Sequence, residues 1–126
     1  MRVFTTKAFR RFAKDNDVSE ESLREAIREL GIGLAHASLG GSVFKQRIAR
    51  KGQGKSGGFR TIIFYKVHER AFFVYGFAKS TQENIERDEL TQLRKLAKEM
   101  LHYDDNTLNF SIQSGELREI WIAEVP

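Results

Sequence analysis

A basic, glycine-rich segment in the middle of the chain holds the residues best suited to chemistry. In RIARKGQGKSGGFRTIIFYK, four glycines lie between two runs of strand-forming residues, and Lys51, Lys55 and Ser56 are interleaved with them. Glycine lets the backbone approach a ligand closely and leaves N–H groups free to point at an anion. Lysine and arginine on either side could then hold phosphate oxygens. The segment therefore predicts a phosphate-binding hairpin.

Phosphate chemistry at such a hairpin needs no metal if RNA is the substrate. The 2′-hydroxyl of RNA can attack the adjacent phosphorus, so an enzyme must remove that proton, stabilise charge on the phosphoryl oxygens and protonate the departing 5′ oxygen. Packing and mutual repulsion can lower the pKa of one lysine enough for it to act as the base. We predict Lys51, Lys55 and Arg60, near Arg50, as the catalytic set.

A wider set of residues is predicted to bind the RNA chain. Basic and hydroxyl side chains would contact phosphates, and aromatic rings could stack on unpaired bases. Strand aromatics are more often core residues, so stacking is the less common role for them. The predicted RNA-binding residues are Lys45, Arg47, Arg50, Ser56, Phe59 and Tyr65.

Two other kinds of site are excluded by spacing. The letters GKS do not form a nucleotide-binding P-loop, because Ala49 stands where that motif needs its first glycine and a strand follows the lysine. His36, His68 and His102 lie far apart without the spacing of metal ligands, and the chain has no cysteine. We therefore expect no metal and no cofactor.

Positive charge is concentrated in the same part of the chain. The protein has 126 residues, with 21 Lys and Arg against 17 Asp and Glu and a net charge of +4. The stretch from Ser42 to His68 holds seven Lys or Arg and no acid, which leaves 14 basic against 17 acidic residues elsewhere, a net charge of −3. A basic field on a mildly acidic body indicates a polyanion partner, nucleic acid before membrane. The alternative is that these cations only solvate strand faces.

Length and composition indicate one globular domain over residues 1–126. Hydrophobic residues make up 40% of the chain and charged residues 30%, as in soluble proteins. The apolar stretch from Ala71 to Ala78 is too short to cross a bilayer, and the N-terminus carries no apolar signal region. We expect a cytoplasmic protein that does not bind membranes.

The N-terminal third predicts a strand and a helical hairpin. Val3 to Thr5 could form a short strand, and Thr5 or Thr6 can cap a first helix. A second helix is predicted from about Ser19 to Gly31, with apolar residues at helical spacing. The following GIGLAHASLGG is interpreted as a connection.

Three strands and a long helix are predicted after this connection. The strands cover residues 42–50, 59–67 and 71–79, with a tight turn at residues 68–70 between the last two. A helix should run from Ile85 or Asp88 to Met100, and the tail predicts a final helix and an edge strand that closes the sheet. The order predicts an α+β fold of two layers, an antiparallel sheet covered by helices.

The chain resembles the RelE/HigB-like toxins of bacterial type II toxin–antitoxin modules, within the RelE/ParE superfamily. The resemblance is carried by GKSGGFR and AFFVYGFAK and extends from FRRFAK to GELREI. It implies a RelE-like fold, with two N-terminal helices on an antiparallel sheet and a long helix after the central strands. It also implies a cognate antitoxin, often of the helix-turn-helix type, and cofactor-free cleavage of mRNA on the ribosome that inhibits translation.

The resemblance also assigns individual residues. By position, the loop lysine of the RelE pattern corresponds to Lys55, the strand arginine to Arg60 and a second basic residue to Lys79. The chain departs from the pattern where many RelE-type nucleases have a tyrosine, since NIERDEL has Ile85 and no tyrosine; Tyr103 could substitute only if the fold brings it back. Two alternatives to an mRNA interferase therefore stay open, a ParE-like inhibitor of DNA gyrase and a non-catalytic nucleic-acid-binding module.

Overall fold

The computed structural model describes residues 1–35, 37–49, 58–78 and 85–120. The elements are β1 (Arg2–Thr6), α1 (Lys7–Asp15), α2 (Glu20–Gly31), β2 (Ala37–Ser38), β3 (Val43–Ile48), β4 (Phe59–Lys66), β5 (Arg70–Ala78), α3 (Arg87–Leu101), α4 (Asp105–Gln113) and β6 (Leu117–Ile120). None of the helices in these ranges has the length and apolar character needed to cross a bilayer. The α+β class predicted from the sequence is confirmed.

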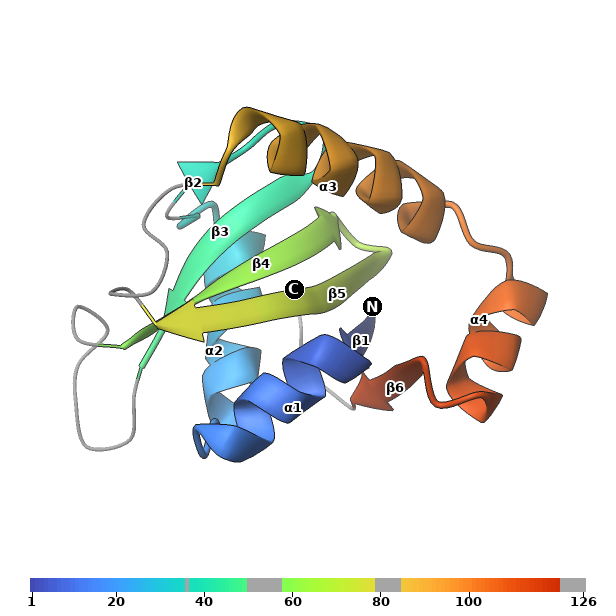
Figure 1. The fold of residues 1–126 in the computed structure, drawn as a ribbon, viewed down its shortest axis with the longest axis horizontal. Coiled ribbons are helices and arrows are strands. Elements are labelled where there is room, and N and C mark those ends of the chain that lie inside the picture. The colour runs from blue at the N-terminus through green and yellow to red at the C-terminus, as the bar shows by residue number, and fades with distance from the viewer. Residues whose placement is uncertain (36, 50–57, 79–84, 121–126) are drawn as a thin grey trace.

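The strands of the described residues form one sheet in the order β2-β3-β4-β5-β1-β6 (Figure 1). Neighbouring strands are antiparallel except β1 and β5, which run parallel, so the sheet is mixed and not antiparallel throughout as predicted. The connectivity permits this parallel pair, because the connection from β1 to β5 contains the helices α1 and α2 and the strands β2, β3 and β4, and parallel neighbours need a long crossover. The predicted edge strand at the C-terminal end is confirmed: β6 pairs with β1 and closes the sheet on that side.

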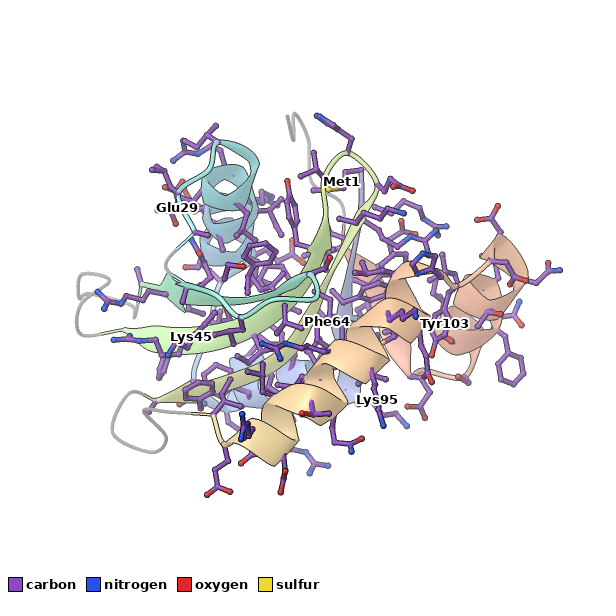
Figure 2. The ribbon with its side chains drawn as sticks, turned by 90° about the horizontal axis from the view of Figure 1, so that it is seen from above. Met1, Glu29, Lys45, Phe64, Lys95 and Tyr103 are labelled. Atoms are coloured by element: carbon purple, nitrogen blue, oxygen red, sulfur yellow. The ribbon has the colours of Figure 1, made fainter. Side chains whose placement is uncertain are left out.

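Helices cover both faces of the sheet, which corrects the predicted two layers. One apolar cluster joins α1 and α2 to residues such as Ile63 and Phe73, and a second joins α3 and α4 to Phe64 and Phe72. Successive residues from Phe59 to Tyr65 in β4 and from Ala71 to Val74 in β5 thus point to opposite faces, and these residues are buried. Figure 2 shows Phe64 and α3 on one side of the sheet and Glu29 of α2 on the other. A continuous apolar strand such as β4 is typical of a sheet covered on both faces.

Both N-terminal helices begin where the sequence predicts, and each start has a side-chain cap. The Thr6 hydroxyl accepts a hydrogen bond from the Phe9 N–H, and the Ser19 hydroxyl accepts one from the Ser22 N–H. Each bond satisfies one of the N–H groups that an α-helix leaves without an internal partner. These caps fix where α1 and α2 begin, and so fix the helices that cover one face of the sheet.

The β4–β5 pair contains a β-bulge that the sequence analysis missed. Ile63 is opposite Phe73, but Ile62 is opposite Tyr75, so Val74 is the extra residue. A bulge interrupts the alternation of side chains along a strand. Because of it, Val74 packs in the α3 cluster while Tyr75 borders α3 on the same face.

Candidate functional site

Three strand ends meet at one edge of the molecule, which we call the loop end. Ile48 at the end of β3 is opposite Phe59 at the start of β4, and Phe59 is opposite Ala78 at the end of β5 (Figure 1). Residues 50–57 and 79–84 therefore both connect to the sheet here. The predicted site residues Arg50, Lys51, Lys55, Ser56 and Lys79 lie outside the described residues.

Arg60 is the predicted catalytic residue that the structure does describe. It is the second residue of β4, opposite Arg47 on one side and Phe77 on the other. The side chain is buried, with 7% of the residue exposed, and its Nη1 has no hydrogen-bond partner within the described ranges. Burial lowers the pKa of the guanidinium, and the charge of Arg47 lowers it further. A buried cation beside a like charge is costly, and a bound anion would relieve that cost.

Two further cations share this face of the sheet. Lys45 and Arg47 on β3 are opposite Ile62 and Arg60, and alternate residues of a strand point to the same side. Arg47 is exposed and Lys45 is half-buried, so their charged groups reach the surface around Arg60. The fold thus brings Lys45, Arg47 and Arg60 together on one face of the sheet.

The two aromatic residues predicted to stack on bases point the other way. Phe59 and Tyr65 are 3% and 5% exposed and belong to the cluster under α1 and α2. Phe59 packs edge-on against Phe12 with ring centroids 5.1 Å apart, and Tyr65 packs edge-on against Phe44 at 6.0 Å. Burial also raises the pKa of the Tyr65 hydroxyl. The stacking prediction is corrected on this ground, because neither ring has a face open to a base.

A cleft beside Arg60 contains residues that the sequence analysis did not single out. This α3 cleft, of about 470 Å³, lies between β4, β5 and the N-terminal half of α3. Its lining includes Ile62, Tyr75, Phe77, Ile85, Gln92 and Leu96. Tyr75 is 46% exposed although it lies in the middle of a sheet strand. Simple alternation could not place Tyr75, because the bulge at Val74 shifts it to the α3 face.

Tyr103 lies at the opposite end of the sheet from the loop end. Its backbone oxygen accepts a 2.7 Å hydrogen bond from Nη1 of Arg70, at the start of β5. Ala78, at the loop end of the same strand, is eight residues further on, about 26 Å at the usual rise of a strand. Figure 2 shows Tyr103 at the far end of α3. Tyr103 therefore cannot replace the tyrosine that is missing near Ile85.

The histidines of the described residues take no part in this site. His68 lies exposed in the turn between β4 and β5 with a φ of 64°, and Nδ1 of His102 is 2.7 Å from the Lys98 carbonyl oxygen. His36 lies outside the described residues. Within the described ranges, no group of three His, Cys, Asp or Glu side chains is placed to hold a metal ion.

These features define a small α+β protein with a mixed sheet, helices on both faces, and a buried arginine among cations at one end. The family model for the RelE toxin of the RelE/RelB toxin–antitoxin system matches residues 1–120, and the chain belongs to this family. It is a RelE-like toxin, and membership of the family implies an antitoxin partner. A search of curated proteins found no match.

Proposed function

We propose that this toxin is a metal-free endoribonuclease that cleaves mRNA on the ribosome and so inhibits translation. The observation that supports the proposal most strongly is the Arg60 guanidinium, buried beside Arg47 with an Nη1 that has no partner in the described part of the chain. Such a group favours an anion, and a phosphoryl group that gains charge in the transition state is favoured most.

The proposed reaction uses the substrate's own 2′-hydroxyl. A lysine of the 50–57 segment, Lys51 or Lys55, removes the hydroxyl proton, and the 2′ oxygen forms a bond to the adjacent phosphorus. Arg60 and Lys79 hold the phosphoryl oxygens as charge builds on them. The bond from phosphorus to the 5′ oxygen breaks, and that oxygen takes a proton from the other of Lys51 and Lys55, which leaves a 2′,3′-cyclic phosphate and a 5′-hydroxyl. Atoms and charge balance without a metal or cofactor.

The remaining parts of the proposal concern location and partners. The mRNA and the ribosome are reached in the cytoplasm, where Lys45, Arg47 and Arg50 would contact phosphates around the scissile bond. The antitoxin is proposed to be a helix-turn-helix protein encoded beside the toxin. Co-expression with the neighbouring gene should yield a complex that elutes as one species and lacks toxicity.

The experiment that tests the activity is primer extension on cellular mRNA after induction of the protein. Wild type should produce new 5′ ends within minutes, and Arg60→Ala and Lys55→Ala should not. Arg24→Ala is the matched control, because Arg24 is exposed on α2, where it pairs with Glu20 at 3.4 Å. It should cleave as wild type does.

Because Arg60 is buried, loss of activity must be separated from loss of folding. Arg60→Met keeps most of the side-chain volume, and the variant should still bind the antitoxin and give the wild-type circular dichroism spectrum. Growth arrest with intact mRNA in the wild type would contradict the proposal and favour a ParE-like inhibitor of gyrase. RNA binding without cleavage or arrest would favour a non-catalytic binding module.

A further inference from the structure

The α3 cleft has two kinds of wall, and the contrast limits what can fill it. Tyr75 and Phe77 of β5 form an aromatic wall, and Tyr75 is 46% exposed. Ile62 of β4 and Leu93 of α3 close the bottom, being 2% and 9% exposed. Gln92 and Glu89 of α3 are the exposed polar residues of the lining: Gln92 supplies an amide with both donors and an acceptor, and Glu89 supplies a carboxylate that can accept from a base edge. The cleft is thus apolar and aromatic inside with a polar edge.

An unpaired nucleobase has the complementary chemistry. Its faces are flat and stack on aromatic side chains, and its edge carries donors and acceptors that an amide can read. A volume of about 470 Å³ is that of a small-molecule site. A purely aliphatic ligand would offer no hydrogen-bond partner to the Gln92 amide or the Tyr75 hydroxyl. The polar rim therefore favours a base over an apolar side chain.

The position of the cleft next to Arg60 indicates that the base would belong to the RNA strand whose phosphate binds Arg60. Phe77, in the cleft wall, is directly opposite Arg60, and Tyr75 is the diagonal neighbour of Arg60 across the β4–β5 pair. Diagonal neighbours in an antiparallel pair are about 7–8 Å apart. A phosphate at Arg60 and a base in the cleft can therefore belong to the same stretch of a single RNA strand.

We propose that the α3 cleft binds one unpaired base of the RNA substrate beside the scissile phosphate and sets a base preference there. Tyr75 and Phe77 stack on the base, and Gln92 contacts its edge. This inference rests on the proposed ribonuclease activity, because it names the substrate subsite next to Arg60. It adds Tyr75, Phe77 and Gln92 as residues that determine specificity without taking part in proton transfer.

Binding can be tested apart from cleavage. The probe is each of the four nucleoside 3′-monophosphates, titrated into purified toxin labelled in its Ile and Leu methyl groups. Methyl signals of Ile62, Leu93 and Leu96 should shift, with one nucleotide giving at least about a threefold lower dissociation constant than the others. Leu108 is the internal control, since it lies in the same apolar cluster but does not line the cleft. Shifts confined to residues near Arg60, with the cleft signals unchanged, would overturn the proposal.

Specificity is tested by mapping cleavage ends in cellular mRNA. Gln92→Ala should flatten the base preference at one position next to the cut, from about tenfold or more to less than about threefold. Tyr75→Ala should lower cleavage about tenfold or more, and Tyr75→Phe should restore it because the ring is kept. The matched controls are Gln113→Ala and Phe110→Ala, exposed residues of α4 that do not line the cleft. Both should keep the wild-type preference and rate.

The possible outcomes separate this inference from the proposed activity. If wild type cleaves mRNA and the Gln92 and Tyr75 variants keep its base preference and rate, the activity stands and the cleft proposal fails. If those variants cleave normally but escape neutralisation by the antitoxin, the cleft belongs to the antitoxin and the proposal also fails. If nucleotides shift the cleft signals but wild type cuts no RNA, the ribonuclease proposal fails and the base site remains.

Discussion

Gln46 and Arg60 are buried polar side chains on neighbouring strands, and they meet opposite environments. Gln46 is fully buried on the face covered by α2, where its Nε2 donates to the Leu34 carbonyl oxygen at 3.3 Å and to Oε1 of Glu29 at 3.4 Å. Arg60 is on the face of α3 and leaves Nη1 without a partner in the described part of the chain. The Gln46 amide thus has partners and the Arg60 Nη1 has none within the described residues, where the Tyr65 hydroxyl, buried under α1 and α2, is the other side-chain atom without one.

This difference indicates a structural role for Gln46 and a functional role for Arg60. Buried polar groups in native proteins are nearly always hydrogen-bonded, so an exception calls for an explanation. Arg60 lies at the loop end, beside Arg47 and the α3 cleft, where an RNA phosphate could supply the missing partner. Unlike the neutral Tyr65 hydroxyl, the Arg60 guanidinium carries a charge and lies beside a second cation. We infer that Gln46 maintains the fold and that Arg60 is placed to bind an anion.

The strongest test of this comparison is Arg60→Met. We expect cleavage to fall about 100- to 1000-fold, equivalent to about 3–4 kcal/mol of transition-state stabilisation, because a positioned charge is lost. The free energy of unfolding should stay the same or rise, because an unsatisfied buried charge is replaced by an apolar side chain of similar length. Urea denaturation and primer extension measure the two effects. A clear loss of stability would show that Arg60 has a structural role, which would contradict the contrast with Gln46.

Gly76→Ala should have the largest effect on stability alone. A Cβ at position 76 would overlap the ring of Phe12 in α1, so helix and strand would have to move apart. Overpacking of a tight core typically costs about 1–3 kcal/mol, and we expect a value near the upper end. Urea denaturation measures the loss. Because the three atoms nearest to that Cβ all belong to the Phe12 ring, the same substitution in a Phe12→Leu background should cost clearly less. Equal costs in both backgrounds would contradict this explanation.

Gln46→Leu tests the buried polar residue whose hydrogen bonds are satisfied. The substitution removes the amide that donates to Glu29 and Leu34, and Glu29 itself is 8% exposed. Loss of a donor to buried acceptors costs about 1–3 kcal/mol, and here we expect about 2 kcal/mol. The effect on cleavage should be less than about twofold. Gln113→Leu, on the exposed end of α4, is the control and should change neither quantity.

The fold could be predicted where local sequence determines structure. Thr6 and Ser19 are good N-cap residues, and the apolar runs of β4 and β5 are long enough to mark central strands. The parallel pairing of β1 with β5 and the short strand β2 could not be predicted, because they depend on contacts between distant parts of the chain. The bulge at Val74 has the same origin, since nothing in AFFVYGFAK marks where alternation breaks.

The candidate site also contains residues that could be predicted from the sequence and residues that could not. Arg60 was recognisable because charge, glycines and family resemblance coincide on one segment, and Lys45 and Arg47 follow from strand alternation. Phe59 was misplaced although alternation gave the signal, since residues 59 and 60 of one strand must point to opposite faces. Gln92 carried no such signal, because only the tertiary packing of α3 places it in the lining of the same cleft as Tyr75 and Phe77.

A cation that has a partner gives the smallest and final test. Arg2 donates to both carboxylate oxygens of Glu119 at 2.8 and 3.0 Å, which joins β1 to β6. This hydrogen bond lowers the pKa of the Glu119 carboxyl and raises the pKa of Arg2, whereas burial lowers the pKa of Arg60.

The sign of the pH effect follows from the carboxyl group. A carboxyl whose pKa is lower in the folded state stabilises the fold above its unfolded pKa, about 4.3 for glutamate, and loses this contribution as the pH falls through the folded pKa. The ion pair is partly exposed, so wild type should exceed Glu119→Gln by less than about 1 kcal/mol at pH 7. That difference, measured as urea midpoints, should shrink steadily below about pH 4 and should be absent at every pH in an Arg2→Gln background. A difference that persists in that background would show that Glu119 acts through another partner, and Arg2 would no longer serve as the satisfied counterpart of Arg60.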